Sequence, residues 1–369
     1  MLALKQRIDV GVEGQLDGFT RGAGGRDDND PSTRVQGVAV CLDVDGELVI
    51  AGELHGGKLV IYILPRRYLR PYGGVMQGKV CLVTGANRGI GRATVEELAR
   101  QGATVLMACR DRAAGEAAKR EIAHSTGNST LELFVADFSV QADVRRLAEE
   151  IKAAHSRLDV IVSNAGVLLL NRVMTVDDIE ATFAVNHLAG FILINELTGL
   201  LKASAPSRVV IVASEAHQRV ADPEDWISTK AYNGRTAYNR SKLANIVFCY
   251  DLAHRLERTG VTVNSCHPGW VNTHVLFSMY DRWWLRWLWP IVQKYFTVTP
   301  AEGAKPVLHL AISHDVEGVN GKYFKEMRAA TSSLISHDAV IGARLWNLSL
   351  RLTGELPPVT VTGEHIAGH

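Results

Sequence analysis

The chain has 369 residues, 47% hydrophobic and 21% charged, so it is long enough for one large domain with a substantial core. Its 40 basic and 39 acidic residues give a net charge of +1, and we therefore expect no nucleic-acid partner. Five cysteines in no metal-ligand spacing predict no metal site and indicate reduced thiols in a reducing compartment.

The N-terminal segment differs in pattern from the rest. Residues 1–35 are rich in glycine and aspartate and are predicted to be disordered. Residues 36–76 contain three apolar runs separated by Asp45-Gly46 and by His55-Gly-Gly57, which favours a small three-stranded β extension followed by a basic linker. We assign no chemistry to it. We also expect no signal peptide and no spanning helix there, because every apolar run is far below the roughly 20 residues that spanning needs.

A glycine-rich turn follows the first predicted strand of the main domain. Residues 79–83 form an apolar run typical of a buried parallel strand, Thr84-Gly-Ala-Asn-Arg-Gly-Ile-Gly91 follows it, and residues 92–101 favour a helix. This order places backbone N–H groups and a helix N-terminus where a pyrophosphate binds. The segment therefore predicts a dinucleotide site, and a turn without a ligand is the alternative.

The next predicted strand, residues 103–109, ends at Arg110. This is the position, about twenty residues beyond the glycines, where NAD-selective folds carry an acid for the ribose 2′-hydroxyl. A guanidinium suits a 2′-phosphate instead, and Arg88 and Arg112 lie near it in the sequence. NADP(H) is favoured over NAD(H), although Asp111 leaves NAD(H) as the alternative.

Three later predicted strands end in polar or glycine-containing turns: Ser163-Asn-Ala-Gly166, Ser214, and the turn from Pro268 to Thr273. Ligands of an open α/β sheet bind outside the carboxyl ends of its strands, so these turns are expected to meet at one edge.

Tyr238 and Lys242 lie four residues apart in a predicted helix, so their side chains share one helical face. A free tyrosine, with a pKa of about 10, is a weak acid or base at neutral pH, and a nearby lysine cation would lower that pKa. We predict that Tyr238 is the catalytic acid/base. For this pair taken alone, a half-buried aromatic beside a solvated lysine is the alternative.

In chain order these motifs resemble the short-chain dehydrogenase/reductase family over residues 77–355, most of all its retinol dehydrogenase-like and WW-domain-oxidoreductase-like branch. The resemblance implies an α/β fold, a doubly wound Rossmann-type three-layer sandwich with a central, mainly parallel sheet of about seven strands, and leaves 356–369 as a C-terminal tail. The likeness rests on Thr84-x3-Gly89-x-Gly91, Asn164-Ala-Gly, Asn186, Ser214, Tyr238-x3-Lys242 and Pro268-Gly.

The resemblance also implies catalytic roles. Tyr238 would protonate the carbonyl oxygen and Ser214 would hydrogen-bond the same oxygen. Lys242 would hold the cofactor ribose and lower the Tyr238 pKa, and Asn186 would anchor a water relay that reprotonates the site through Lys242. Taken alone, Ser214 is also typical of a helix cap, and Asn186 of a polar kink in a helix.

For the cofactor, the resemblance implies that Asp137 accepts from the adenine amine, that Asn164 and Gly166 border the adenosine ribose, and that Thr273 meets the carboxamide. The predicted cofactor-binding set is Gly85, Asn87, Arg88, Gly89, Ile90, Gly91, Arg110, Asp137, Asn164, Gly166, Tyr238, Lys242, Pro268, Gly269 and Thr273.

Four of the seven tryptophans, Trp283, Trp284, Trp287 and Trp289, follow the Pro-Gly turn, where the family places a substrate lid. This favours an apolar substrate, and peripheral membrane contact or plain packing are the alternatives. We therefore expect an NADP(H)-dependent oxidoreductase that interconverts a carbonyl and an alcohol on a retinoid-, steroid- or lipid-aldehyde-like molecule.

Two other functions stay open at this point. One is an NAD-dependent alcohol dehydrogenase acting on a steroid or sugar-derived alcohol, and the other is a non-catalytic dinucleotide-binding sensor or interaction protein. The resemblance further implies a homodimer formed through helices near 179–201 and 237–256. We expect the protein on the cytoplasmic side, with peripheral membrane association as one alternative.

Overall fold

The computed structural model describes residues 41–44, 47–55, 58–64, 76–220, 222–230, 232–269 and 299–356. By its internal contacts the chain divides into two compact units, Met1–Gly73 and Gly74–His369. The first unit contains an antiparallel sheet in the order β1-β2-β3, as the apolar runs and turns predicted. Its strands are β1 (Cys41–Val44), β2 (Glu47–His55) and β3 (Lys58–Leu64).

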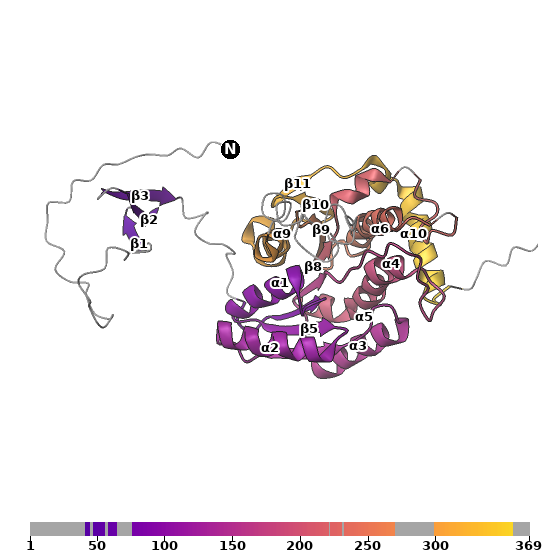
Figure 1. The fold of residues 1–369 in the computed structure, drawn as a ribbon, viewed down its shortest axis with the longest axis horizontal. Helices are drawn as coiled ribbons and strands as arrows, with labels where there is room; N and C mark the ends of the chain where they lie inside the picture. The colour runs from indigo at the N-terminus through magenta and orange to yellow at the C-terminus, as the bar shows by residue number, and fades with distance from the viewer. Residues whose placement is uncertain are drawn as a thin grey trace, which may run out of the picture. The chain divides into compact units, whose positions relative to one another are not determined.

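An eight-stranded sheet in the order β11-β10-β9-β8-β7-β4-β5-β6 forms the centre of the second unit (Figure 1). Seven strands are parallel, and β11 pairs with β10 in the antiparallel direction, which adds one strand to the expected seven. The strands are β4 (Val80–Thr84), β5 (Thr104–Cys109), β6 (Leu131–Val135), β7 (Val160–Ser163), β8 (Ser207–Val212), β9 (Val261–His267), β10 (Lys322–Lys325) and β11 (Arg328–Ala330).

Helices flank this sheet in two groups, since α1 contacts α2 and α9, whereas α3 contacts α5. Strand β4 is buried along its whole length, as expected of a parallel strand covered on both faces. The helices are α1 (Gly89–Arg100), α2 (Arg112–Thr126), α3 (Gln141–Ala154), α4 (Ala181–Phe183), α5 (Ala189–Ala203), α6 (Gly234–Arg255), α9 (Pro300–Ile312) and α10 (Ala339–Leu352).

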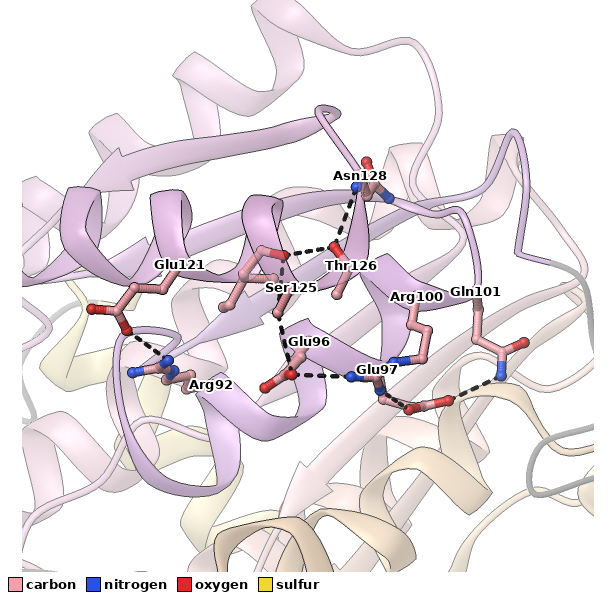
Figure 2. Close-up of polar contacts among 10 residues, drawn as sticks. Arg92, Glu96, Glu97, Arg100, Gln101, Glu121, Ser125, Thr126 and Asn128 are labelled. Atoms are coloured by element: carbon pink, nitrogen blue, oxygen red, sulfur yellow. Dashed lines mark hydrogen bonds and ion pairs between the residues drawn. The ribbon is translucent and has the colours of Figure 1, made fainter. Parts of the chain in front are cut away.

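Polar contacts hold α1 against α2 (Figure 2). Arg92 pairs with Glu121 at 2.7 Å, and the Ser125 hydroxyl donates to Glu96 at 3.3 Å. Asn128 donates to two backbone carbonyls, one in the last turn of α1 and one just before β5, at 2.8 and 2.9 Å. Exposed ion pairs are each worth only about 0–1 kcal/mol, so these contacts orient α1 more than they stabilise it.

The segment from Ala181 to Ala203, which includes α5, is a core helix. Among the described residues it alone is long and apolar enough to cross a membrane, but 61% of its most apolar window is buried inside the protein. Phe191, Ile194 and Leu197 are fully buried in the main core cluster. Its hydrophobicity is therefore explained by packing within the fold.

Helix α10 covers part of α5 and α6. The Trp346 ring lies 5.0 Å from the Phe191 ring and 5.9 Å from the Phe248 ring, measured between centroids. The Arg255 guanidinium stacks on Trp346 at 3.7 Å. The homodimer expected through α5 and α6 stays a prediction, and it would have to accommodate α10 on this face.

Candidate active site

The glycine turn between β4 and α1 depends on backbone conformations that favour glycine. Gly85 and Gly89 have φ values of +66° and +57°. A Cβ added at Gly91 would lie 2.2 Å from the Gly85 carbonyl oxygen and 2.6 Å from Asn164 Nδ2, so no side chain fits there. Asn87 lies in the same turn, and Ile90 lies in the first turn of α1.

The N-terminus of α1 is open to an anion. Arg88, at the N-cap position, makes no side-chain capping bond, and the first turn carries no acidic residue. Within the described residues, the first N–H groups of α1 therefore have no side-chain acceptor. Such N–H groups bind phosphate groups, so this turn fits the pyrophosphate of a dinucleotide.

Asn164 joins the end of β7 to the end of β4. The Thr84 hydroxyl oxygen accepts from the backbone N–H groups of Asn164 and Ala165, both at 2.9 Å, and Asn164 Nδ2 donates to the Thr84 carbonyl at 2.8 Å. The predicted asparagine therefore supports the glycine turn from the neighbouring strand.

Arg110 is exposed and follows directly after β5. Its Nη1 atom lies 4.0 Å from Asp137 Oδ2. Asp111 caps α2, because its carboxylate accepts from Ala114 N at 3.0 Å. The acid that could have served as the ribose ligand is thus engaged in capping, while the guanidinium beside it extends into solvent.

Asn186 lies in a π-helical segment, Ala184–Leu188, between α4 and α5. Its Oδ1 accepts from Val167 N at 2.7 Å, and its Nδ2 donates to the Val167 carbonyl and to Ser241 Oγ, both at 2.9 Å. Isolated π turns are frequent at functional sites. Asn186 therefore lies at a helix irregularity, which was the alternative explanation for this residue. It also links this segment to α6, the helix that carries Tyr238.

Tyr238, Lys242 and Ser214 come together at the carboxyl end of β8. Lys242 is buried, its Nζ donates to the Val212 carbonyl at 2.9 Å, and the same atom lies 5.7 Å from the centroid of the Tyr238 ring. The Ser214 side chain lies close enough to the Tyr238 hydroxyl to lower its pKa. A Cβ added at Gly166 would lie 3.7 Å from Lys242 Nζ, so the turn after β7 borders the same group.

The pKa values differ from the sequence-based expectation. Burial raises the pKa of Tyr238 to about 12, opposed only by the hydrogen bond from Ser214, although the residue as a whole is half-buried. Burial also lowers the pKa of Lys242 to about 8. The predicted lowering of the Tyr238 pKa by Lys242 is not found, because desolvation dominates at the phenol.

Ser214 caps a short 3₁₀ helix, Glu215–Arg219, by accepting from Ala216 N at 3.2 Å. The Ser214 carbonyl is bonded to Nδ1 of His217 at 2.7 Å. Ser214 therefore caps this helix, which was the alternative function considered for it, and its side chain also lies near Tyr238.

Glu215, the residue after Ser214, lies in a polar network. Its Oε1 accepts from Lys325 Nζ at 2.6 Å, and its Oε2 lies 3.4 Å from His267 Nε2. No local pattern indicates the partner Lys325, because 110 residues separate it from Glu215.

Pro268 and Gly269 follow β9, and Gly269 has a φ of +85°. Thr273 and the four tryptophans Trp283, Trp284, Trp287 and Trp289 lie outside the described residues.

The family model described as short chain dehydrogenase matches residues 79–282. The chain belongs to the short-chain dehydrogenase/reductase family. It is an oxidoreductase acting on CH-OH groups, and the predicted fold class and retinol dehydrogenase-like resemblance are confirmed.

Retinol dehydrogenases are prominent among the relatives of this dehydrogenase. Retinol dehydrogenase 14 of Mus musculus is 42% identical over 294 residues, covering 77% of this chain and 88% of the relative. Retinol dehydrogenase 12 of Homo sapiens is 40% identical over 280 residues, covering 76% and 87%.

Two solved structures illustrate the shared fold. An uncharacterised protein from Mycobacterium Paratuberculosis has a TM-score of 0.61 and 30% identity, covering 76% of this chain and 94% of that one. The Pseudomonas aeruginosa RhlG/NADP active-site complex has a TM-score of 0.56 and 26% identity, covering 69% and 96%.

Proposed function

We propose that the protein is an NADP(H)-dependent oxidoreductase that interconverts a carbonyl and an alcohol on an apolar, retinoid-, steroid- or lipid-aldehyde-like substrate. The observation that carries the proposal is that Ser214, Tyr238 and Lys242 meet at the carboxyl end of β8, with Lys242 Nζ 5.7 Å from the centroid of the Tyr238 ring. The bound dinucleotide would supply or accept a hydride. The chain itself supplies the proton and stabilises charge on oxygen.

Tyr238 is the proposed proton donor. With its pKa raised to about 12, the phenol is protonated at neutral pH and can donate to a carbonyl oxygen as negative charge develops there. Ser214 Oγ already accepts from Ala216 N, which leaves its own O–H as the donor to the same oxygen. The resting protonation state therefore suits carbonyl reduction better than alcohol oxidation.

Lys242 and Asn186 are proposed to support this proton transfer. Lys242 would bind the cofactor ribose and, with its pKa lowered to about 8, can exchange its proton near neutral pH. The Asn186 amide is committed to Val167 and Ser241, so its proposed contribution to the proton relay is to hold the turn after β7 beside Lys242.

Arg110 is the proposed ligand of the 2′-phosphate that distinguishes NADP(H) from NAD(H). Its exposed guanidinium follows β5, and the adjacent carboxylate of Asp111 is occupied in capping α2. Asp137 Oδ1 accepts from Ser139 N at 2.8 Å, so the proposed acceptor for the adenine amine is Oδ2, which lies 4.0 Å from Arg110 Nη1.

The proposed substrate class follows from the relatives, which are named as retinol dehydrogenases, and from the predicted tryptophan-rich lid. The test is oxidation of NADPH against NADH by the purified full chain with retinal, steroid ketones, long-chain aldehydes and quinones. We expect turnover of apolar carbonyls with NADPH. Equal use of NADH would contradict the Arg110 assignment, and tight cofactor binding without any turnover would favour a dinucleotide sensor.

A further inference from the structure

A single carboxylate connects three strand ends beside Ser214. Glu215 follows Ser214 beyond the end of β8, His267 is the last residue of β9, and Lys325 is the last residue of β10. His267 and Lys325 are neighbours across the β9–β10 pairing. Glu215 binds Lys325 at 2.6 Å and lies 3.4 Å from His267, so it contacts both.

The pair of Glu215 and Lys325 stays ionised through the neutral range. The hydrogen bond from Lys325 lowers the Glu215 pKa, and the same bond raises the Lys325 pKa. The two side chains are 27% and 40% exposed, and an ion pair this accessible adds only about 0–1 kcal/mol to stability. A contribution to global stability is therefore too small to be its main effect.

His267 forms the buried side of the network. Its side chain is 7% exposed, and burial lowers its pKa to about 4. The charged or titratable groups that act on it are Glu215, Lys325, His217 and Lys242. Because the His267 imidazole is neutral, it is not a cationic partner of Glu215. Among the described residues, Lys325 is then the one close cationic partner of this carboxylate.

Ser214 is hydrogen-bonded to the short segment of backbone that carries Glu215. Ser214 Oγ accepts from Ala216 N, so the orientation of the serine side chain is coupled to the backbone on both sides of Glu215. The Ser214 carbonyl is held by His217, whose Nε2 accepts from Ser333 N at 3.1 Å. After Lys325 the chain turns through Glu326 and Met327, both with positive φ, which indicates a locally constrained turn at the same edge.

We propose that Glu215, anchored by Lys325, is a positioning residue that sets the orientation of Ser214 toward Tyr238. This rests on the proposed function, because the orientation matters for turnover only if Ser214 hydrogen-bonds the reacting oxygen. A displacement of about 1 Å at such a group can lower a rate by as much as roughly 100-fold. Glu215 itself touches no reacting atom in this scheme.

The test is a double-mutant cycle with Glu215→Gln and Lys325→Met in the full chain, using NADPH and the best substrate of the wild type. Each single variant is expected to lower kcat by about tenfold, and the double variant by no more than either single one, because both remove the same interaction. The Kd for NADPH should stay within about twofold, since the cofactor-binding turns are untouched. Lys325→Arg should restore most of kcat, because it keeps the cation.

Lys322→Met is the matched control, because Lys322 is exposed on the same strand β10 and loses the same charge. It should leave kcat within about twofold. Independent effects that multiply in the double variant, or an unchanged kcat in Glu215→Gln, would overturn the proposal. A crystal structure of Glu215→Gln tests the positioning role even if the wild type shows no turnover. A displaced Ser214 in that structure would support the role. A Ser214 that keeps its contact with Tyr238 would overturn it.

Discussion

The carboxyl edge of the sheet has two halves that use different chemistry. At the β4–β7 half, the groups suited to bind a ligand are mostly backbone atoms: the N–H groups at the start of α1 and glycines such as Gly85 and Gly91. At the β8–β10 half they are side chains, above all Ser214, Tyr238 and Lys242, with Glu215 paired to Lys325 beside them. The first half is defined by backbone shape, and the second by burial and long-range pairing.

This difference teaches which substitutions each half tolerates. Adding atoms is harmful where backbone must approach a ligand, because no space exists for a Cβ. Removing a polar atom is harmful where buried side chains hydrogen-bond one another, because the remaining group is left without its hydrogen-bond partner. Five predicted outcomes test this contrast, in order of decreasing expected size.

Tyr238→Phe should lower turnover by about 1,000-fold or more, within the range of general acid catalysis, while NADPH affinity changes little. The phenyl ring keeps the packing of α6 and loses only the hydroxyl. Steady-state kinetics and NADPH fluorescence titration measure the two quantities. Tyr250→Phe is the control, because it removes a tyrosine hydroxyl from the same helix. That hydroxyl is bonded to Ser332 Oγ at 2.7 Å and not to Ser214. A large loss of cofactor binding in Tyr238→Phe would contradict its role as proton donor.

Gly91→Ala should destabilise the protein by about 1–3 kcal/mol and weaken NADPH binding, because the added Cβ would overlap the Gly85 carbonyl. Thermal unfolding with and without NADPH measures both effects. Gly199→Ala in α5 is the matched control, since a Cβ there meets no atom within 4 Å. It should be neutral or stabilising by about 0.5–1 kcal/mol. Equal behaviour of the two variants would refute the close approach at Gly91.

Arg110→Ala should raise the Kd for NADPH by about tenfold and leave that for NADH nearly unchanged, because a charge-assisted hydrogen bond contributes about 1.5–3 kcal/mol. Isothermal titration with both cofactors measures the ratio. Arg120→Ala, at an exposed arginine on α2, controls for the loss of one surface charge. A similar loss for both cofactors would argue against a 2′-phosphate contact.

Carbonyl reduction should decline by a few-fold as pH rises above about 8, where Lys242 loses its proton, while Tyr238, with a pKa of about 12, stays protonated. A pH–rate profile that extends about two pH units on either side of the Lys242 pKa measures this decline. A constant rate to the alkaline end would remove Lys242 from the proton path.

The same shift has a defined effect on stability. Because the folded-state pKa of Lys242 lies below its ordinary value, the unfolded chain binds more protons between about pH 8 and the ordinary lysine pKa. This group therefore makes the folded state more stable as pH rises through that window. Denaturant titrations of the wild type and Lys242→Met at two pH values isolate its contribution.

Much of the β4–β7 half was predictable from the sequence, because its determinants are local. The Gly85-to-Gly91 turn, the strand before it and the helix after it are contiguous, and their conformations follow from residue type. Asn164 also fell where the pattern placed it, although its bonds to Thr84 connect different strands. Here the spacing of motifs reflects the regular repetition of strand and helix.

The β8–β10 half was predictable in its residues but not in its electrostatics. Tyr238 and Lys242 were singled out from their spacing, yet their pKa shifts are caused mainly by burial, which the sequence does not indicate. The Glu215–Lys325 pair joins residues from distant segments. Desolvation and ion pairing are set by the sum of many neighbours, so no short pattern encodes them.

The order of strands and helices and the glycine turn after β4 were predictable from the amino-acid sequence, because they depend on local conformation. The proposed set of Ser214, Tyr238 and Lys242 came from the Tyr238–Lys242 spacing and from the family resemblance. Three contacts could be seen only in the folded chain: Trp346 of α10 packs against α5 and α6, Asn186 bonds Val167 and Ser241, and Glu215 binds Lys325. Those contacts join segments far apart in the chain, and they form only when packing of the core brings the segments together.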